Sequence, residues 1–135
     1  MRKLKVAPGE HYHVFNRGVN KGEIFFSESD YRRFFRAAVH YKTKDPKFSY
    51  EKFLNALDDP VSLKPIKPMG PSKVQILTYC LMPNHFHFLL KQLGDEGVTS
   101  YFRHLANSYS HYVSVKHKRV GPLFQGRFKN VLIQS

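Results

Sequence analysis

Apolar and polar side chains alternate along two stretches of the chain, which is the spacing of β strands with one buried face. In residues 11–17, His11, His13 and Phe15 fall on one face, and Tyr12, Val14 and Asn16 fall on the other. In residues 73–92, a largely apolar run is followed by Pro-Asn and then by a second run of strand-forming residues. Because Pro and Asn favour turns, we expect a β hairpin that turns at Pro83-Asn84.

Two further stretches repeat apolar residues at the spacing of an amphipathic helix. One begins after Ser27, a residue type that often caps helix N-termini, and its apolar stripe ends before Lys42. The other runs from Val98 to about Lys116. The apolar positions are Tyr31, Phe34, Phe35, Ala38 and Val39 in the first helix and Val98, Tyr101, Phe102, Leu105, Tyr109, Tyr112 and Val113 in the second. Both stripes predict a helix that packs one face against a core.

The remaining segments predict a loop and a last strand. Residues 50–57 allow a short helix, and four prolines then favour an irregular Pro-rich loop at about 58–72. We expect the last strand to begin at Phe124 and to run to about Ile133. The order is therefore β-α-β-β-α-β, which predicts an α+β, ferredoxin-like (RRM-like) fold with an antiparallel sheet and both helices on one face. The length of 135 residues fits a single domain.

The net charge of +12 indicates a polyanionic partner, and nucleic acid is the first candidate. Glu96 is the last acidic residue, and six Lys or Arg residues follow it. This basic C-terminal third can supply phosphate contacts, although a solvated basic surface is the alternative. No signal peptide and no apolar run of about 18 residues is present, so we expect a cytoplasmic protein without a membrane partner.

One cysteine is present, so the chain can form no internal disulfide. Because Cys80 lies in an apolar run, we expect it to be a buried small apolar residue.

His85 and His87 are the candidate metal ligands. In the second strand of the hairpin they share one face, about 7 Å apart along the strand, which suits two ligands of one divalent ion. On the residues alone, two solvated histidines are the alternative. His11 and His13 form a second such pair, but no turn fixes it beside a partner, so we assign it no role.

Tyr109 and Tyr112 are chemically possible nucleophiles. Both lie on the apolar stripe of the second helix, however. We therefore expect packed tyrosines whose hydroxyls reach water.

With these residues in view, the chain resembles the single-tyrosine transposases, which are the IS200-like enzymes and their relatives associated with repeated extragenic palindromes, within the HUH endonuclease group. Three stretches carry the resemblance: residues 13–20, residues 79–90 with Met-Pro-Asn-His-Phe-His at their centre, and residues 120–129 with Gly-Pro-Leu-Phe-Gln-Gly-Arg-Phe-Lys. The resemblance implies one IS200-like (HUH) domain over residues 1–135.

The resemblance also implies a chemistry. His85 and His87 would bind Mg²⁺ or Mn²⁺, and the metal would polarise a phosphate of single-stranded or hairpin DNA. A tyrosine would cleave and rejoin the strand through a 5′-phosphotyrosine, without a nucleotide cofactor. Related enzymes form dimers, so a homodimer is a further expected partner. The predicted DNA contacts are Arg17, Asn84, Arg103, Lys116, Lys118, Arg119, Gln125, Arg127 and Lys129.

In this family the nucleophilic tyrosine lies on a helix after the last strand, so it is expected after Ser135, and no tyrosine of this chain matches that position. We therefore expect this chain to bind DNA hairpins without cleaving them. One alternative is an inactive or truncated module that binds hairpin DNA. Another is an RRM-like RNA-binding domain, which the histidines at the β hairpin disfavour because such domains present aromatic residues on the sheet.

Overall fold

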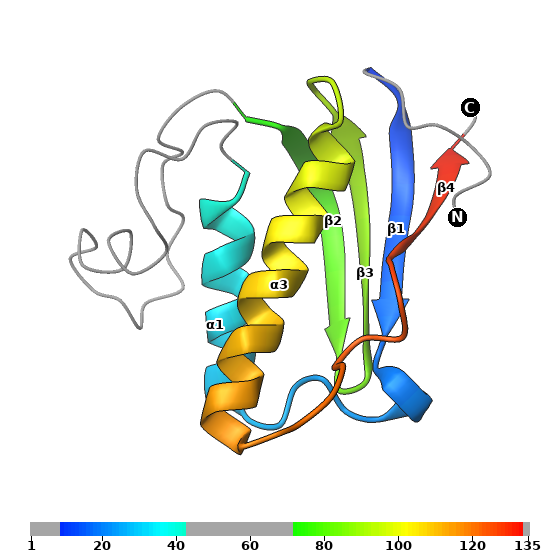
Figure 1. Cartoon of the computed structure of the whole chain (residues 1–135). Coiled ribbons are helices and arrows are strands. Elements are labelled where there is room, and N and C mark those ends of the chain that lie inside the picture. The colour runs from blue at the N-terminus through cyan, green and yellow to red at the C-terminus, as the bar shows by residue number, and fades with distance from the viewer. Residues whose placement is uncertain (1–8, 43–71, 134–135) are drawn as a thin grey trace.

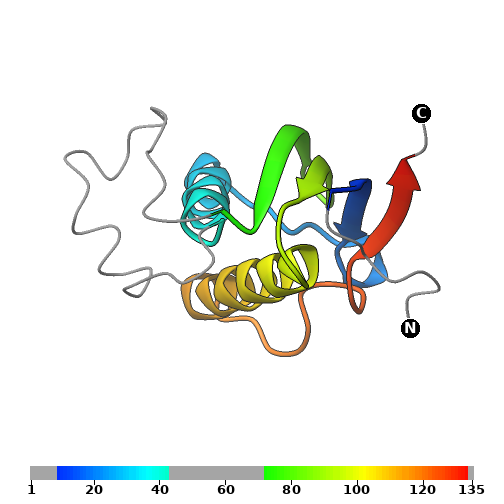
Figure 2. The ribbon, with the colours of Figure 1, turned by 90° about the horizontal axis from the view of Figure 1, so that it is seen from above.

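The computed structural model describes residues 9–42 and 72–133, and in that part of the chain four strands form one sheet with two helices packed on one face (Figures 1 and 2). The strands are β1 (His11–Arg17), β2 (Val74–Met82), β3 (His85–Gln92) and β4 (Lys129–Ile133). The helices are α1 (Glu28–His40) and α3 (Gly97–His117), and a short 3₁₀ helix spans Val19–Lys21. The predicted β-α-β-β-α-β order and α+β, ferredoxin-like fold are confirmed.

The strand order is β2-β3-β1-β4, and every neighbouring pair is antiparallel. The two central strands, β1 and β3, are far apart in the sequence, yet Tyr12 pairs with Leu90 and Arg17 pairs with His85. The β hairpin turns at Pro83-Asn84, as predicted. This register places the end of β1 beside the start of β3.

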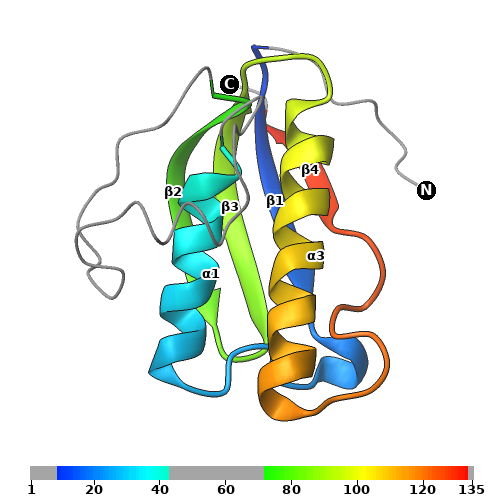
Figure 3. The ribbon, with the colours of Figure 1, turned by 60° about the vertical axis from the view of Figure 1, so that its left-hand side comes forward.

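The core lies between the helices and one face of the sheet (Figure 3). Alternation along the central strands buries Tyr12 and Val14 of β1 and Phe88 of β3. The ring of Phe88 lies 6.2 Å from Phe34 of α1 and 5.4 Å from Phe102 of α3. One aromatic side chain of the sheet thus packs against both helices, as the apolar stripes predict.

A buried carboxylate ties the start of α1 to the end of α3. Asp30 has no exposed surface, and it accepts hydrogen bonds from Lys116 Nζ at 2.9 Å and the Tyr112 hydroxyl at 2.8 Å. His117 Nε2 lies 3.0 Å from its other oxygen, and the backbone N–H of Phe26 donates to that oxygen at 2.9 Å. Burial alone would raise the pKa of Asp30, but these hydrogen bonds outweigh burial and lower the pKa to about 2.

The last strand begins later than the sequence predicted, at Lys129 rather than Phe124. Residues 124–128 instead form a loop that is held to the end of β1. Phe124 is buried in the core, and the side chain of Asn16 donates from Nδ2 to the carbonyl of Gly126 at 3.1 Å. Gly126 has φ 71°, which a strand residue does not adopt. The β propensity of the segment is overridden by these anchors.

The expectation of a buried Cys80 is wrong, because Cys80 is exposed. It pairs with His87 on the face of the sheet that α1 and α3 leave open. The expected short helix at 50–57 and the Pro-rich loop up to residue 71 lie outside the described residues. Neither α1 nor α3, the helices of the described ranges, has the length and apolar character of a membrane span.

Candidate functional site

Three segments meet at one end of the sheet, where β1 ends and the β2–β3 hairpin turns (Figure 1). The backbone N–H of Gly18, just after β1, donates to the carbonyl of Asn84 in the turn at 2.9 Å. The N–H of Gln125 donates to the carbonyl of Arg17 at 2.9 Å. A Cβ atom at Gly18 would collide with the backbone oxygen of Gly22, so the close approach of these two residues requires glycine at position 18. The stretches that carry the sequence resemblance, 13–20, 79–90 and 120–129, all reach this place.

His85 and His87 project from β3 on the open face, with ring centroids 5.0 Å apart and ring planes at 87°. Nδ1 of His85 donates to the side-chain oxygen of Asn84 at 2.7 Å, because an amide oxygen can only accept. Nδ1 of His87 shares a hydrogen bond of 2.8 Å with Nε2 of His13. Both bonds engage Nδ1, so Nε2 is the nitrogen of each ring that is left for a metal or another ligand.

The protonation state of His87 also suits metal binding. Burial lowers the pKa of His87, and the neighbouring His13 and His85 lower it further. A lowered pKa favours the neutral imidazole, which is the form that binds metal ions.

His13 is the site residue that the sequence reasoning missed. It stacks on His87 with ring centroids 5.0 Å apart, and Phe15 packs against both rings at 4.9 and 5.8 Å. The signal was present as the first His-x-His, but its meaning depends on the pairing of β1 with β3. His11 lies on the same face one step further, opposite Lys91 and away from the β2–β3 turn.

A cavity of about 470 Å³ lies beside these rings. It is lined by Phe15, Asn16, Arg17, Lys21, Asn84, His85, His87, Gln125 and Lys129. We call it the histidine cavity. Arg17 Nε donates to Gln125 Oε1 at 3.0 Å, which holds that guanidinium at the rim. Three cationic side chains and no carboxylate belong to the described lining, so the cavity is suited to an anion such as a phosphate.

The histidine cavity offers two candidate metal ligands, His85 and His87, rather than a complete set of ligands. Within residues 9–42 and 72–133, no group of three or more His, Cys, Asp or Glu side chains is placed to hold a metal ion. The side-chain oxygens of Asn84 and Gln125 already accept hydrogen bonds from His85 and Arg17. The two imidazoles would therefore fit a divalent ion whose other ligands are water or phosphate oxygens, because Mg²⁺ and Mn²⁺ favour oxygen ligands.

The predicted DNA contacts divide into three groups. Arg17, Asn84, Gln125 and Lys129 line the histidine cavity. Arg103 and Arg127 line a second cavity between α3 and the loop after it. Lys116, Lys118 and Arg119 lie at the C-terminal end of α3, which Figure 1 shows at the same end of the molecule as the β2–β3 turn.

The third group has structural contacts of its own. Lys116 is paired with the buried Asp30. Arg119 lies over the ring of Phe26 at 5.6 Å, and Lys118 ends the helix in a left-handed conformation with φ 53°. DNA contact by all nine residues stays a prediction.

Neither candidate tyrosine lies at the histidine cavity. The hydroxyl of Tyr109 donates to the carbonyl of Ile24 at 2.6 Å, and burial raises its pKa. The hydroxyl of Tyr112 donates to Asp30. Both side chains pack in or against the core as predicted, and each hydroxyl donates to a protein group. In the part of the chain that the structure describes, no tyrosine lines the histidine cavity.

Comparison with known proteins finds matches among solved structures but none by sequence. No protein-family model matches the chain, and no curated protein matches its sequence. Among solved structures, the chain is similar to a REP-associated tyrosine transposase bound to a REP hairpin, with a TM-score of 0.56 and 15% sequence identity. The match covers 100% of this chain and 62% of the solved chain. At this level of identity the likeness establishes the fold.

Proposed function

We propose that this protein binds hairpin or single-stranded DNA as a domain of the single-tyrosine transposase kind, and that His85 and His87 hold a divalent metal ion beside a DNA phosphate. The observation that carries the proposal is the histidine cavity. It combines two imidazoles whose Nδ1 atoms are engaged, three cationic side chains and no carboxylate among its described lining. The solved transposase of the same fold is bound to a hairpin, which supports nucleic acid as the anion.

The residues of this chain would act on DNA by binding and orientation. Arg17, Lys21 and Lys129 would neutralise phosphates at the cavity rim, which fixes the backbone of the strand. A bound Mg²⁺ or Mn²⁺ would supply Lewis-acid polarisation of one phosphate. His85 and His87 would hold that ion through Nε2, because their Nδ1 atoms are held by Asn84 and His13.

Strand cleavage would require a hydroxyl nucleophile in addition. Tyr109 and Tyr112 are committed to the core and to Asp30, so we assign neither of them to this role. The activity proposed for the described residues is thus DNA binding with a metal held at a phosphate. Transposition and strand rejoining by the whole protein belong to the same proposal but depend on that nucleophile.

The first experiment measures binding of a fluorescent DNA hairpin with a single-stranded flank by anisotropy at rising salt. Three cationic side chains at one cavity predict that log K falls with log salt with a slope of about −3 or steeper, since each phosphate contact contributes about −0.9. Binding that is absent at low salt, or insensitive to salt, would overturn the proposal.

The second experiment measures Mn²⁺ affinity by calorimetry for the natural chain and for the double variant His85→Ala, His87→Ala. We expect the double variant to lose Mn²⁺ binding and to keep its affinity for the DNA hairpin in the absence of metal. His111→Ala, an exposed histidine on α3, is the matched control and should bind Mn²⁺ normally. DNA binding without any Mn²⁺ binding would instead support the hairpin-binding module that lacks metal chemistry.

One observation favours RNA as a second candidate ligand. Phe15 on β1 stacks against His87 on β3 at 5.8 Å on the open face of the central strands, where RRM-like domains stack bases. Competition of the bound DNA hairpin by an RNA hairpin of the same sequence separates the two. If the proposal is right, unlabelled DNA hairpin should displace the bound DNA hairpin at lower concentration than the RNA hairpin does.

A further inference from the structure

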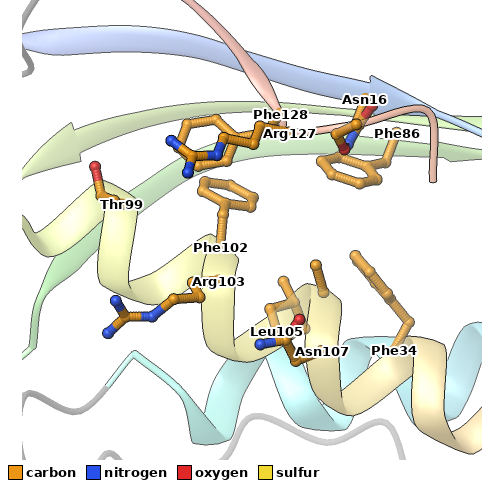
Figure 4. Close-up of a pocket in the computed structure, with 12 residues that line it drawn as sticks. Asn16, Phe34, Phe86, Thr99, Phe102, Arg103, Leu105, Asn107, Arg127 and Phe128 are labelled. Atoms are coloured by element: carbon orange, nitrogen blue, oxygen red, sulfur yellow. The ribbon is translucent and has the colours of Figure 1, made fainter. Parts of the chain in front are cut away.

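A second cavity, also of about 470 Å³, lies between α3 and the loop that leads into β4 (Figure 4). Its volume is within the range of small-ligand sites. It is lined by Asn16, Phe34, Phe86, Thr99, Phe102, Arg103, Leu105, Ala106, Asn107, Gly126, Arg127 and Phe128. We call it the aromatic cavity. Of its lining residues, only Asn16 also lines the histidine cavity.

The floor of the aromatic cavity is apolar and its rim is cationic. The ring of Phe128 is half-buried and lies 5.1 Å from the ring of Phe102, which comes from α3 (Figure 4). Arg103 and Asn107 are exposed one turn apart on α3, and Arg127 is exposed on the opposing loop. The described lining holds two guanidinium groups and no carboxylate. An apolar surface with a cationic side chain on each side suits a planar ring that carries a phosphate.

The two cavities share one wall. Gln125 and Lys129 line the histidine cavity, whereas the intervening Gly126 to Phe128 line the aromatic cavity. Asn16 lines both cavities, and it holds the wall because its Nδ2 donates to the carbonyl of Gly126 and its Oδ1 accepts the N–H of Arg17. A ligand that occupies both cavities must span this wall. A polynucleotide, with repeated phosphates and bases, meets this requirement.

We infer that the aromatic cavity is a nucleobase subsite, in which a base of single-stranded DNA packs against Phe128 and its phosphate lies between Arg103 and Arg127. The inference rests on the proposed DNA binding, and it adds a base contact close to the phosphate held at the histidine cavity. The asparagine amide of Asn107 stands at the rim, where it can donate to or accept from a base edge. The subsite therefore makes binding depend on bases as well as on phosphates.

The test compares two probes of about a dozen nucleotides, an oligothymidine and an abasic strand with the same phosphodiester backbone. Phosphate contacts are common to both probes, so their affinity ratio isolates the bases. The natural chain should bind oligothymidine about tenfold more tightly than the abasic strand, a ratio within the range of stacking on one aromatic side chain. Phe128→Ala should reduce the ratio towards one while abasic affinity stays the same.

Two further variants test the subsite in case Phe128→Ala does not fold. Ala106→Leu adds bulk inside the aromatic cavity without removing a charge, and it should also reduce the ratio. Arg103→Ala should lower the affinity for both probes more than Arg32→Ala does. The control Arg32→Ala removes the same charge from an exposed ion pair on α1.

The outcomes separate this inference from the proposed function. Equal affinity of the natural chain for both probes, together with salt-sensitive binding of the DNA hairpin, overturns the subsite and leaves the proposed function standing. Loss of salt-sensitive binding to every probe overturns the proposed function itself. An unchanged ratio in folded Ala106→Leu and Phe128→Ala would also refute the subsite.

Discussion

The two sides of the sheet hold polar clusters of opposite character. On the helix-covered side, Asp30 is fully buried and is bonded to Lys116 and Tyr112, with His117 beside it, so its charge is balanced within the chain. On the open side, the histidine cavity brings together three cations and two imidazoles without a carboxylate in its described lining. The first cluster balances its charge within the protein, whereas the described lining of the second holds no acidic side chain to balance its cations.

This difference separates polar groups that hold the fold from polar groups that bind a partner. A buried carboxylate whose hydrogen bonds are all made within the protein costs several kcal/mol to disrupt, but it has little to offer a ligand. Uncompensated cations at a cavity destabilise the fold slightly by mutual repulsion and attract an anion. Substitutions in the Asp30 cluster should therefore affect stability, and substitutions at the histidine cavity should affect ligand affinity.

The largest expected effect is the loss of Asp30. Asp30→Ala removes the acceptor of the Tyr112 hydroxyl and of the Phe26 backbone N–H as well as the counter-charge of Lys116, so we expect the free energy of unfolding to fall by about 3 kcal/mol. Urea unfolding followed by circular dichroism measures this. The affinity of the folded variant for a DNA hairpin should not change.

The matched control is Glu28→Gln on the same helix. Glu28 pairs with Arg32 at 2.7 Å, but both side chains are exposed, so the change should cost about 0.5 kcal/mol or less. A similar cost for Asp30→Ala and Glu28→Gln would show that the buried cluster does not hold the helices together.

The next effect is acid sensitivity in two successive pH windows. Burial lowers the pKa of His40 to about 4, so the unfolded chain binds this proton more readily and stability falls as pH drops from about 6.5 to 4. The pKa of Asp30 is about 2 in the folded chain against an ordinary value of 3.8, so its contribution is present above pH 4 and is lost from about pH 4 to 2.

We expect a loss of roughly 2 to 3 kcal/mol from each group, measured as urea midpoints across pH. His40→Asn should flatten the upper window, and Asp30→Asn should flatten the lower one. Stability that is constant from pH 6.5 to 2 in the natural chain would contradict both assignments.

The covered side was the more predictable from the sequence. The apolar stripe that includes Phe102 and Tyr109, and the alternation that buries Val14 and Phe88, follow directly from periods of 3.6 and 2 residues. These patterns fix which face of each element is buried, and with the order of elements they give the fold class. They do not show that Asp30 meets Lys116, because that contact joins two helices far apart in the sequence.

The open side was predicted only in part, for two physical reasons. Alternation puts His13 and His87 on the same face as each other once the strands pair, but the register that brings them together is set by the whole sheet. Cys80 looked buried because its strand is apolar, yet β2 is an edge strand with one uncovered face. Local propensity likewise could not show that Asn16 would hold Gly126 out of β4.

The third effect concerns His13, whose ring is hydrogen-bonded to the ring of His87. His13→Ala removes the hydrogen bond to His87 Nδ1, so we expect Mn²⁺ affinity to fall about tenfold, the lower end of what lost outer-shell bonds cost. His11→Ala is the matched control, because it lies on the same strand and face but opposite Lys91. Calorimetry gives the affinities, and nitrogen NMR of the His87 ring should register a change of tautomer in His13→Ala only. Equal Mn²⁺ affinity in both variants would show that His13 packs against His87 but does not support metal binding.

The smallest expected effect is on the salt dependence of DNA binding, and it tests directly whether the open side lacks its counter-charge. Lys129→Ala removes one cation from the lining of the histidine cavity, so the slope of log K against log salt should become shallower by about 1. Lys91→Ala, on the open face but outside that lining, is the charge-matched control and should alter the slope less. Because Lys129 is exposed, the free energy of unfolding should stay within about 0.5 kcal/mol of the natural chain. Identical slopes for the two variants would mean that the anion is attracted by the overall charge of +12 and not by the histidine cavity.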